Sequence, residues 1–247
     1  EPPAMSDDVA QDIVIPVFDP VTDLGPFWYT RAAVGRKGSG KSKFAVRAMF
    51  WYLRNEIDTA VSFVPTSRSN KDPSYFVPSA FDYENWDSER CTQIYEWFKA
   101  KFENDKPRKV IFLIDDCNAV TDAKTGKLTC VYKAPAIAKL AKEGRHNGMG
   151  ICVCAQNVKD MPPDMRNQMH QVFLFACASE KEIEDARLAW ATHCPKELFK
   201  TIFNGCTAAA DGKKSCLVID LNKIVGTDPS SGFFVWKPPF IDKPFRC

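Results

Sequence analysis

Three glycines, a lysine and a serine at fixed spacing are the residues of this chain best suited to chemistry. Gly35, Gly40, Lys41 and Ser42 fit the pattern G-x-x-x-x-G-K-[ST]. In this pattern backbone N–H groups wrap a phosphate chain, the lysine reaches the β and γ phosphates, and the hydroxyl binds Mg²⁺. Gly38 is a further residue without a Cβ, which allows close backbone approach. The predicted nucleotide-binding residues are Gly35, Arg36, Lys37, Gly38, Ser39, Gly40, Lys41, Ser42 and Lys43.

The segments around this loop support a phosphate site rather than a flexible surface turn. Residues 27–34 are apolar and β-favouring, and residues 43–55 carry apolar side chains at helical spacing. A strand, a glycine loop and a helix in this order place helix N–H groups and the positive end of the helix dipole at an anion.

Polar residues that follow two later apolar runs supply candidates for hydrolysis. Asp115 and Asp116 end the run 110–114, and Gln156 ends the run 150–157. We predict that Ser42 and Asp115 hold Mg²⁺, that Asp116 accepts a proton from the attacking water, and that Gln156 senses the γ phosphate or orients that water. Acidic residues at strand ends also cap helices, and that alternative stays open.

The remaining pattern predicts strands that alternate with helices. Residues 59–65, 110–114, 150–157, 171–176, 215–221 and 232–236 are expected strands; 13–18 is an expected edge strand, and 119–132 an expected hairpin or loop. Expected helices are 43–55, 87–102, 134–144, 179–191, 195–203 and a short one in 162–170. Fully apolar strands between helices predict an α/β fold with a mostly parallel sheet. We expect a flexible segment at 1–12 and a single domain at 13–247.

Composition restricts the class of protein. The chain has 247 residues, a net charge of +2 and 45% apolar residues, so it forms a substantial core and any nucleic-acid contact must come from a local patch. Its ten cysteines lack regular spacing and are expected to be reduced and intracellular. No apolar run approaches the roughly 18 residues of a membrane span, and a structural zinc site is not expected.

A family resemblance connects these motifs. The segments GRKGSGKS, VIFLIDD and GRHNGMGICVCAQN, followed by VKDMPPDMRNQ, resemble the DNA packaging ATPases of poxviruses and other large DNA viruses, in the FtsK-HerA superfamily of ring motors. The resemblance covers roughly residues 27–178 and continues more weakly through CLVIDL and FFVWKPP. It implies a RecA-like P-loop NTPase core with a small C-terminal β extension.

The resemblance also implies cofactors, partners and a further catalytic residue. It implies ATP and Mg²⁺, double-stranded DNA, a homo-oligomeric ring (pentamer or hexamer), capsid or portal-like proteins, and a place in the viral factory of the host cytoplasm and in the virion. Arg145 stands eleven positions before Gln156, which in the superfamily is the place of an arginine that acts on the neighbouring subunit's nucleotide. Arg166 matches a common arginine of the packaging enzymes, with no role assigned.

Some features depart from the resemblance or leave choices open. Cellular members usually carry Asp-Glu where this chain has Asp115 and Asp116, so the identity of the base is open. Solvation is as good an account of the candidate DNA contacts Arg68, Lys71, Lys124 and Lys127, and Trp86, Trp97 and Phe98 are expected in the core. Two rival functions remain, a nucleotide or small-molecule kinase and a non-catalytic nucleotide-binding assembly factor.

Overall fold

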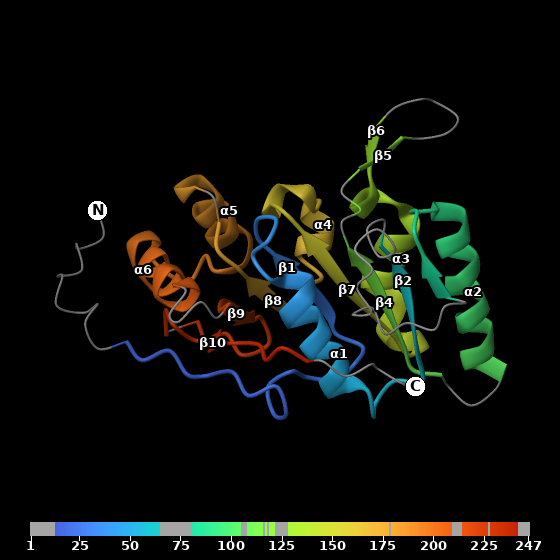
Figure 1. Ribbon diagram of the computed structural model, residues 1–247, viewed down its shortest axis with the longest axis horizontal. Helices are drawn as coiled ribbons and strands as arrows, with labels where there is room; N and C mark the ends of the chain where they lie inside the picture. The colour runs from blue at the N-terminus through green and yellow to red at the C-terminus, as the bar shows by residue number, and fades with distance from the viewer. Residues whose placement is uncertain are drawn as a thin grey trace.

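The computed structural model of the chain describes residues 13–64, 81–104, 108–115, 117, 119–121, 128–177, 179–208, 214–226 and 228–241. Eight strands in these ranges form one sheet (Figure 1). In order across the sheet they are β10 (Phe233–Trp236), β9 (Cys216–Asp220), β8 (Gln171–Leu174), β1 (Thr30–Val34), β7 (Met149–Ala155), β4 (Val110–Asp115), β2 (Thr59–Phe63) and β3 (Asp82–Tyr83).

The sheet is parallel except at its C-terminal extension. Neighbouring strands from β8 to β3 pair in parallel, whereas β9 is antiparallel to both β8 and β10. The predicted α/β fold, with a mostly parallel sheet and a small C-terminal β extension, is therefore confirmed.

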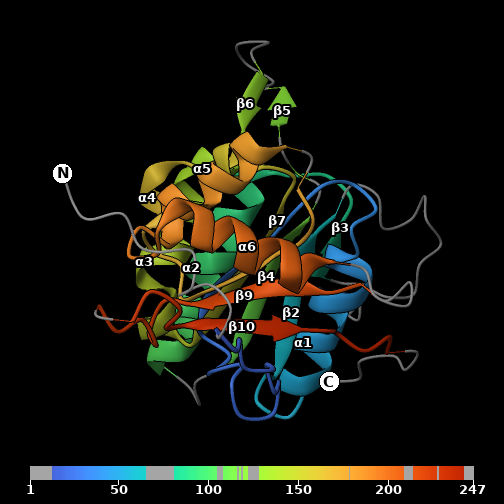
Figure 2. The ribbon, with the colours of Figure 1, turned by 90° about the vertical axis from the view of Figure 1, so that its left-hand side faces the viewer.

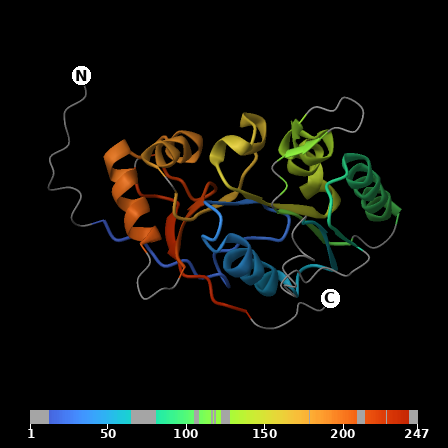
Figure 3. The ribbon, with the colours of Figure 1, turned by 45° about the horizontal axis from the view of Figure 1, so that its top comes forward.

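Helices cover the two faces of the sheet unequally, as Figure 3 shows. One face carries α1 (Arg47–Leu53), which continues a π-helical turn at Lys41–Val46. The other face carries α2 (Ser88–Asn104), α3 (Pro135–Glu143), α4 (Pro163–Arg166), α5 (Glu180–Trp190) and α6 (Lys196–Thr207). The expected helices all occur, although the first ends at Leu53 rather than at residue 55.

The apolar strands divide their side chains between these two layers. In β4, Phe112 and Ile114 pack with the core under α2 to α6, whereas Ile111 and Leu113 pack with the core under α1. A strand with two buried faces must be apolar at every position, which explains the uninterrupted run before Asp115. Cys152 and Cys154 fill the α1 side of β7 as small buried groups, and the nine cysteines in the described ranges are free thiols.

Two predictions need correction. Residues 13–18 form no strand; Val17 makes a single bridge to Val235 at the edge of β10, because Pro16 has no N–H to continue a ladder. Trp97 is not a core residue, since 48% of its surface is exposed. The buried side of α2 consists of Cys91, Tyr95 and Phe98, and Trp97 lies next to Phe98 on the outside of that helix.

The C-terminal strands close one edge of the sheet beside α6 (Figure 2). Phe233 and Leu217 pack toward α6, whereas Trp236 packs toward α1. At the other end of the molecule, where a hairpin or loop is expected, β5 (Ala119–Thr121) pairs with β6 (Leu128–Cys130) and the two strands project from the α/β body (Figure 1). No helix in the described ranges has the length and hydropathy to cross a lipid bilayer.

Candidate nucleotide site

The glycine loop leaves the sheet at the carboxyl end of β1, where the sequence predicts it. The Gly35 N–H still donates to the Ala155 carbonyl of β7 at 3.2 Å. A Cβ on Gly35 would come within 2.7 Å of Phe175, so only glycine fits the exit from the strand. Gly40 has φ 105°, in the left-handed region, directly before the helix begins at Lys41. Both glycines are therefore required by the backbone.

Lys41 is held inside the loop. It is 9% exposed, and its Nζ donates to the carbonyl oxygens of Gly35 at 2.5 Å and Arg36 at 3.2 Å. Arg36, Lys37 and Gly38 are exposed on the outside of the loop. The Lys41 ammonium thus lies over the loop. The first N–H groups of the helix that follows have no partner within the helix. This part of the chain therefore combines backbone donors with a buried positive charge.

Serines of the loop offer hydroxyl groups at two depths. Ser42, half-buried in the first turn, is the residue predicted to bind metal. Ser39 is 7% exposed, and its Oγ lacks a hydrogen-bond partner among the described atoms. Since buried hydroxyl groups are normally satisfied, the Ser39 hydroxyl is a donor available to a ligand in the loop.

Asp115 lies at the same edge of the sheet as Lys41. It ends β4, is 4% exposed, and is in register with Cys154 on β7, the strand between β4 and β1. The pKa of the Cys154 thiol reflects both charges. A hydrogen bond with Cys152 and burial raise this pKa well above its ordinary value, Asp115 raises it further, and Lys41 lowers it. One thiol therefore lies within electrostatic reach of both side chains.

Gln156 lies between these two groups. It directly follows Ala155, the residue of β7 that is in register with Val34 at the end of β1. Its half-buried position beyond the end of the middle strand brings it to the edge that carries Lys41 and Asp115. The order β1, β7, β4 thus collects the three side chains at the carboxyl ends of neighbouring parallel strands, where ligands of open α/β sheets bind.

Arg145 lies at the opposite edge. It occupies the 3₁₀ turn Gly144–Asn147 directly before β7 and is exposed, with its Nε 3.2 Å from His146 Nε2. The seven residues of β7 separate the turn from Gln156 by roughly 20 Å at about 3.3 Å per residue. Arg145 therefore does not reach the glycine loop of its own chain.

Some of the predicted residues lie outside the part of the chain that the structure describes. Asp116, the proposed base, lies outside the described residues, as do Arg68, Lys71, Lys124 and Lys127. Arg166 ends α4, where its carbonyl accepts from Trp190 Nε1 at 3.1 Å. This contact ties α4 to α5, and the Arg166 Nε is buried without a hydrogen-bond partner among the described atoms.

Two residues that the sequence did not reveal lie beside the loop and the helix that follows it. Lys214, just before β9, lies against the loop, because a Cβ on Gly40 would come within 2.9 Å of Lys214 Cγ. Phe240, after β10, lies over the first turns of the helix, with its ring 5.8 Å from that of Phe44. Neither belongs to a motif, and both reach the loop only because β9 and β10 extend the sheet next to β8.

The donor set suits magnesium. Mg²⁺ prefers oxygen ligands and binds through one or two carboxylates together with substrate phosphates. The Ser42 hydroxyl and the buried Asp115 carboxylate are ligands of that type, at the edge where the glycine loop begins.

Comparison with solved structures identifies the fold. The chain matches the genome packaging NTPase B204 of Sulfolobus turreted icosahedral virus 2, in complex with AMPPCP, with a TM-score of 0.57 and 18% identity over 90% of this chain and 100% of that one. The fold is that of RecA-like P-loop ATPases. The pCW3 conjugation coupling protein TcpA matches with a TM-score of 0.59 and 14% identity over 96% of this chain and 69% of that one. The resemblance to packaging ATPases is thus confirmed at the level of the fold.

Sequence relatives come from large DNA viruses. The chain is 28% identical to protein 015R of Frog virus 3 (isolate Goorha) and covers 64% of it, and 25% identical to protein 075L of Invertebrate iridescent virus 6 and covers 77% of it; 89% and 85% of this chain are matched. The chain thus spans about two thirds to three quarters of these two proteins, both uncharacterised. No family model matches the chain.

Proposed function

We propose that this chain is an ATP-hydrolysing motor that moves double-stranded DNA into a preformed viral capsid. The observation that carries the proposal is the meeting of Lys41 and Asp115 at one edge of the sheet, on either side of β7. A phosphate loop and a buried carboxylate with one strand between them supply what phosphoryl transfer needs. These are N–H groups that bind the phosphates, a positive charge and an oxygen that can bind the metal.

ATP binding follows from the loop. Backbone N–H groups from Gly38 to Lys43 cradle the phosphates. Lys41 exchanges its hydrogen bonds with the Gly35 and Arg36 carbonyls for the β and γ phosphates, to which a buried ammonium is attracted more strongly than to neutral carbonyls.

Hydrolysis requires a polarised phosphate and an oriented water. Ser42 and Asp115 would hold Mg²⁺, which when bound neutralises the charge on the β and γ phosphates. Gln156, between Lys41 and Asp115, orients the attacking water by hydrogen bonding, and Asp116 accepts its proton.

The placement of Arg145 supports the proposal of a homo-oligomeric ring. Because this exposed side chain lies at the far edge of the sheet, it stabilises the transition-state charge of a nucleotide bound by the neighbouring subunit. Such an arginine contributes about a thousandfold or more to the rate of phosphoryl transfer. ATP then lies between subunits, and each hydrolysis event is coupled to a movement of one subunit against the next.

DNA is proposed as the substrate of this movement. B204 is described as a DNA-packaging ATPase, and the sequence relatives belong to large DNA viruses. Contacts to the phosphate backbone of DNA inside a ring need neither base recognition nor a high net charge, in agreement with the +2 of this chain. Capsid or portal-like proteins would dock the ring, in the host cytoplasm where virions assemble.

The direct test measures Mg²⁺-dependent ATP turnover with and without linear double-stranded DNA. We expect turnover that DNA stimulates, and a loss of about a hundredfold or more in Lys41→Ala, because that variant lacks the charge clamp on the transferred phosphate. Turnover without any response to DNA would favour the kinase alternative. Equal turnover in Lys41→Ala and the wild-type protein would contradict the proposed site.

The shared site makes a second prediction. Lys41→Ala and Arg145→Ala are each expected to be inactive, because one lacks the cis clamp and the other the trans arginine. Mixed rings contain some interfaces with an intact Lys41 facing an intact Arg145, so mixing the two proteins should restore part of the ATPase activity. A mixture as inactive as its components would contradict the action of Arg145 in trans.

A further inference from the structure

The segment after β10 crosses the helix that follows the glycine loop. Trp236, at its start, is 2% exposed and packs against Phe18 and Phe173, with ring centroids 5.3 and 5.4 Å away. Ile241, at its end, packs against the same core under α1. Between these two anchors Phe240 is 49% exposed, although burial of a phenylalanine ring is normally favourable. The segment therefore holds an aromatic ring on the surface.

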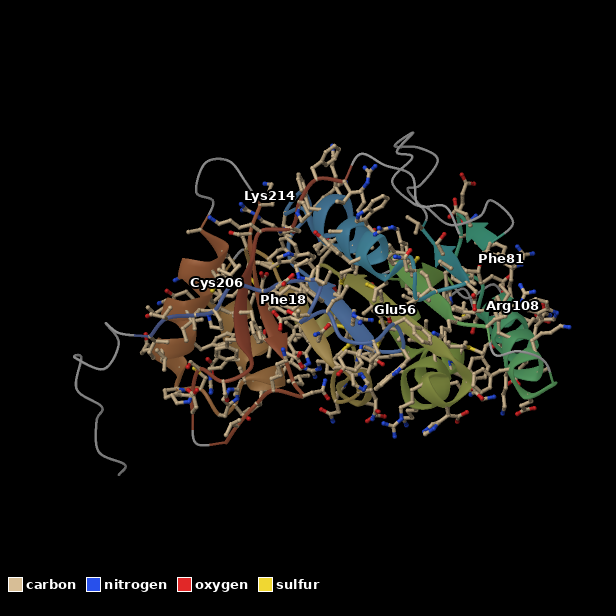
Figure 4. All side chains as sticks on the ribbon, turned by 90° about the horizontal axis from the view of Figure 1, so that it is seen from below. Phe18, Glu56, Phe81, Arg108, Cys206 and Lys214 are labelled. Atoms are coloured by element: carbon tan, nitrogen blue, oxygen red, sulfur yellow. The ribbon has the colours of Figure 1, made fainter. Side chains whose placement is uncertain are left out.

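A continuous series of contacts joins this ring to the loop. The Phe240 centroid lies 5.8 Å from that of Phe44, 5.1 Å from Arg47 Cζ and 5.5 Å from Lys43 Nζ. Phe44 in turn touches the loop, since a Cβ on Gly40 would come within 3.2 Å of Phe44 Cδ2. Figure 4 looks onto this face of the molecule and labels Lys214, the other residue that lies against Gly40.

The direction of a bound nucleotide follows from the loop. Its terminal phosphates lie with Lys41 and Ser42, and its α phosphate toward the N–H groups at the start of the helix. The ribose and base must then extend away from Lys41, past the exposed side chain of Lys43. Among the described residues, Phe240 presents its half-exposed ring beside Lys43 and Arg47.

We propose that Phe240 stacks on the base of the nucleotide, so that the C-terminal β extension completes the site that the glycine loop begins. This inference rests on the proposed function and adds a base-binding residue to it. An aromatic ring stacks on any base, because every base has a π face. Lys43 and Arg47 fix the orientation of the ring by cation–π contacts.

The test separates the base from the phosphates. Binding of ATP and of inorganic tripolyphosphate is measured by calorimetry for the wild-type protein, Phe240→Ala, Phe240→Trp and Phe240→Leu. The control is Trp97→Ala, which removes an aromatic side chain of nearly the same exposure (48%) from α2. Phe240→Ala should weaken ATP binding about tenfold, as the loss of base stacking does elsewhere, and should change tripolyphosphate binding less than twofold. Phe240→Trp and Trp97→Ala should bind ATP like the wild-type protein.

Phe240→Leu keeps the apolar bulk without the π face, so it serves if the alanine variant melts at a lower temperature; it should weaken ATP binding severalfold. ATP binding within twofold of wild type in both variants would overturn the inference. So would an equal loss of ATP and tripolyphosphate, which would mean that Phe240 only supports the loop. Either result leaves the proposed function intact. Failure of that function would appear differently, as a wild-type protein without ATP turnover or as equal turnover in Lys41→Ala and the wild-type protein.

Discussion

Two buried cations lie near the opposite ends of β1, and they differ in how their donors are used. Arg31, at the start of the strand, is 2% exposed and donates to the carbonyls of Leu24, Gly25, Pro26, Phe27 and Tyr29 and to Gln171 Oε1. Lys41, after the strand, is 9% exposed and donates to two carbonyls of its own loop. The guanidinium is saturated by the protein, whereas the ammonium can exchange its partners for a ligand.

The difference separates structural charge from functional charge. Burial lowers the pKa of Arg31 to about 10, so the guanidinium remains protonated at neutral pH and fixes the segment 24–29 to the sheet. Gln171, which accepts from Arg31, also donates to Asp220 Oδ2 at 3.0 Å and so extends this network to β9. At the other end, Lys41 is surrounded by glycines and exposed loop residues. Burial of a charge alone therefore does not identify a binding site. A buried charge that can exchange its hydrogen-bond partners, next to backbone N–H groups that can bind a phosphate, does.

The largest effect expected from this comparison is on stability. Arg31→Met would leave several buried carbonyls without a donor and should lower the free energy of unfolding by about 3 kcal/mol, or the melting temperature by roughly 6–12 °C. Lys41→Met should lower it by only about 1 kcal/mol, because it leaves two carbonyls without a donor and that of the exposed Arg36 can bind water instead. Thermal melts of the two variants give the comparison. Equal destabilisation would mean that Lys41 is a structural cation as well.

A smaller effect is expected from pH at the Arg31 end. His170 accepts from the Thr30 N–H through Nδ1 and stacks on Tyr29 at 4.6 Å, and burial, then Arg31 and Arg145, lower its pKa. The unfolded chain therefore binds a proton at this histidine more readily than the folded one, so stability falls as the pH drops through and below 6.5. Urea unfolding at pH 7.5, 6.5 and 5.5 should show a shallower loss in His170→Asn, whose amide oxygen can still accept from Thr30. Identical slopes in both proteins would contradict a neutral His170.

The sequence predicts the parts of the site that are local. The spacing of Gly35, Gly40 and Lys41 is set by a phosphate chain, and apolar runs before Asp115 and Gln156 follow from strands buried on both faces. The order β1, β7, β4 cannot be read from one chain, because strand order depends on long-range packing; the resemblance implied only a RecA-like core. The wrong expectation for Trp97 has a related cause. Helical spacing places Trp97 near the buried side of α2, but the packing of the helix on the sheet decides that Phe98 is buried and Trp97 exposed.

Lys214 and Phe240 show where sequence patterns end. Lys214 lies against Gly40 and Phe240 against Phe44 of the following helix, yet both lie far from the loop in the chain and in segments without a motif. Their positions depend on the antiparallel pairing of β9 with β8 and of β10 with β9, which returns the chain to the loop. Sequence periodicity predicted these strands but not their place at the β8 edge.

Calorimetric titration of ATP, with and without Mg²⁺, into the wild-type protein, Lys41→Ala and Asp115→Asn tests most directly whether the glycine loop and Asp115 form one site for ATP and Mg²⁺. We expect heat of binding for the wild-type protein that Mg²⁺ increases, binding weakened at least tenfold in Lys41→Ala, and a loss of the Mg²⁺ effect in Asp115→Asn at an unchanged melting temperature. A wild-type protein that takes up no ATP, or an Asp115→Asn protein with the full Mg²⁺ effect, would contradict this expectation.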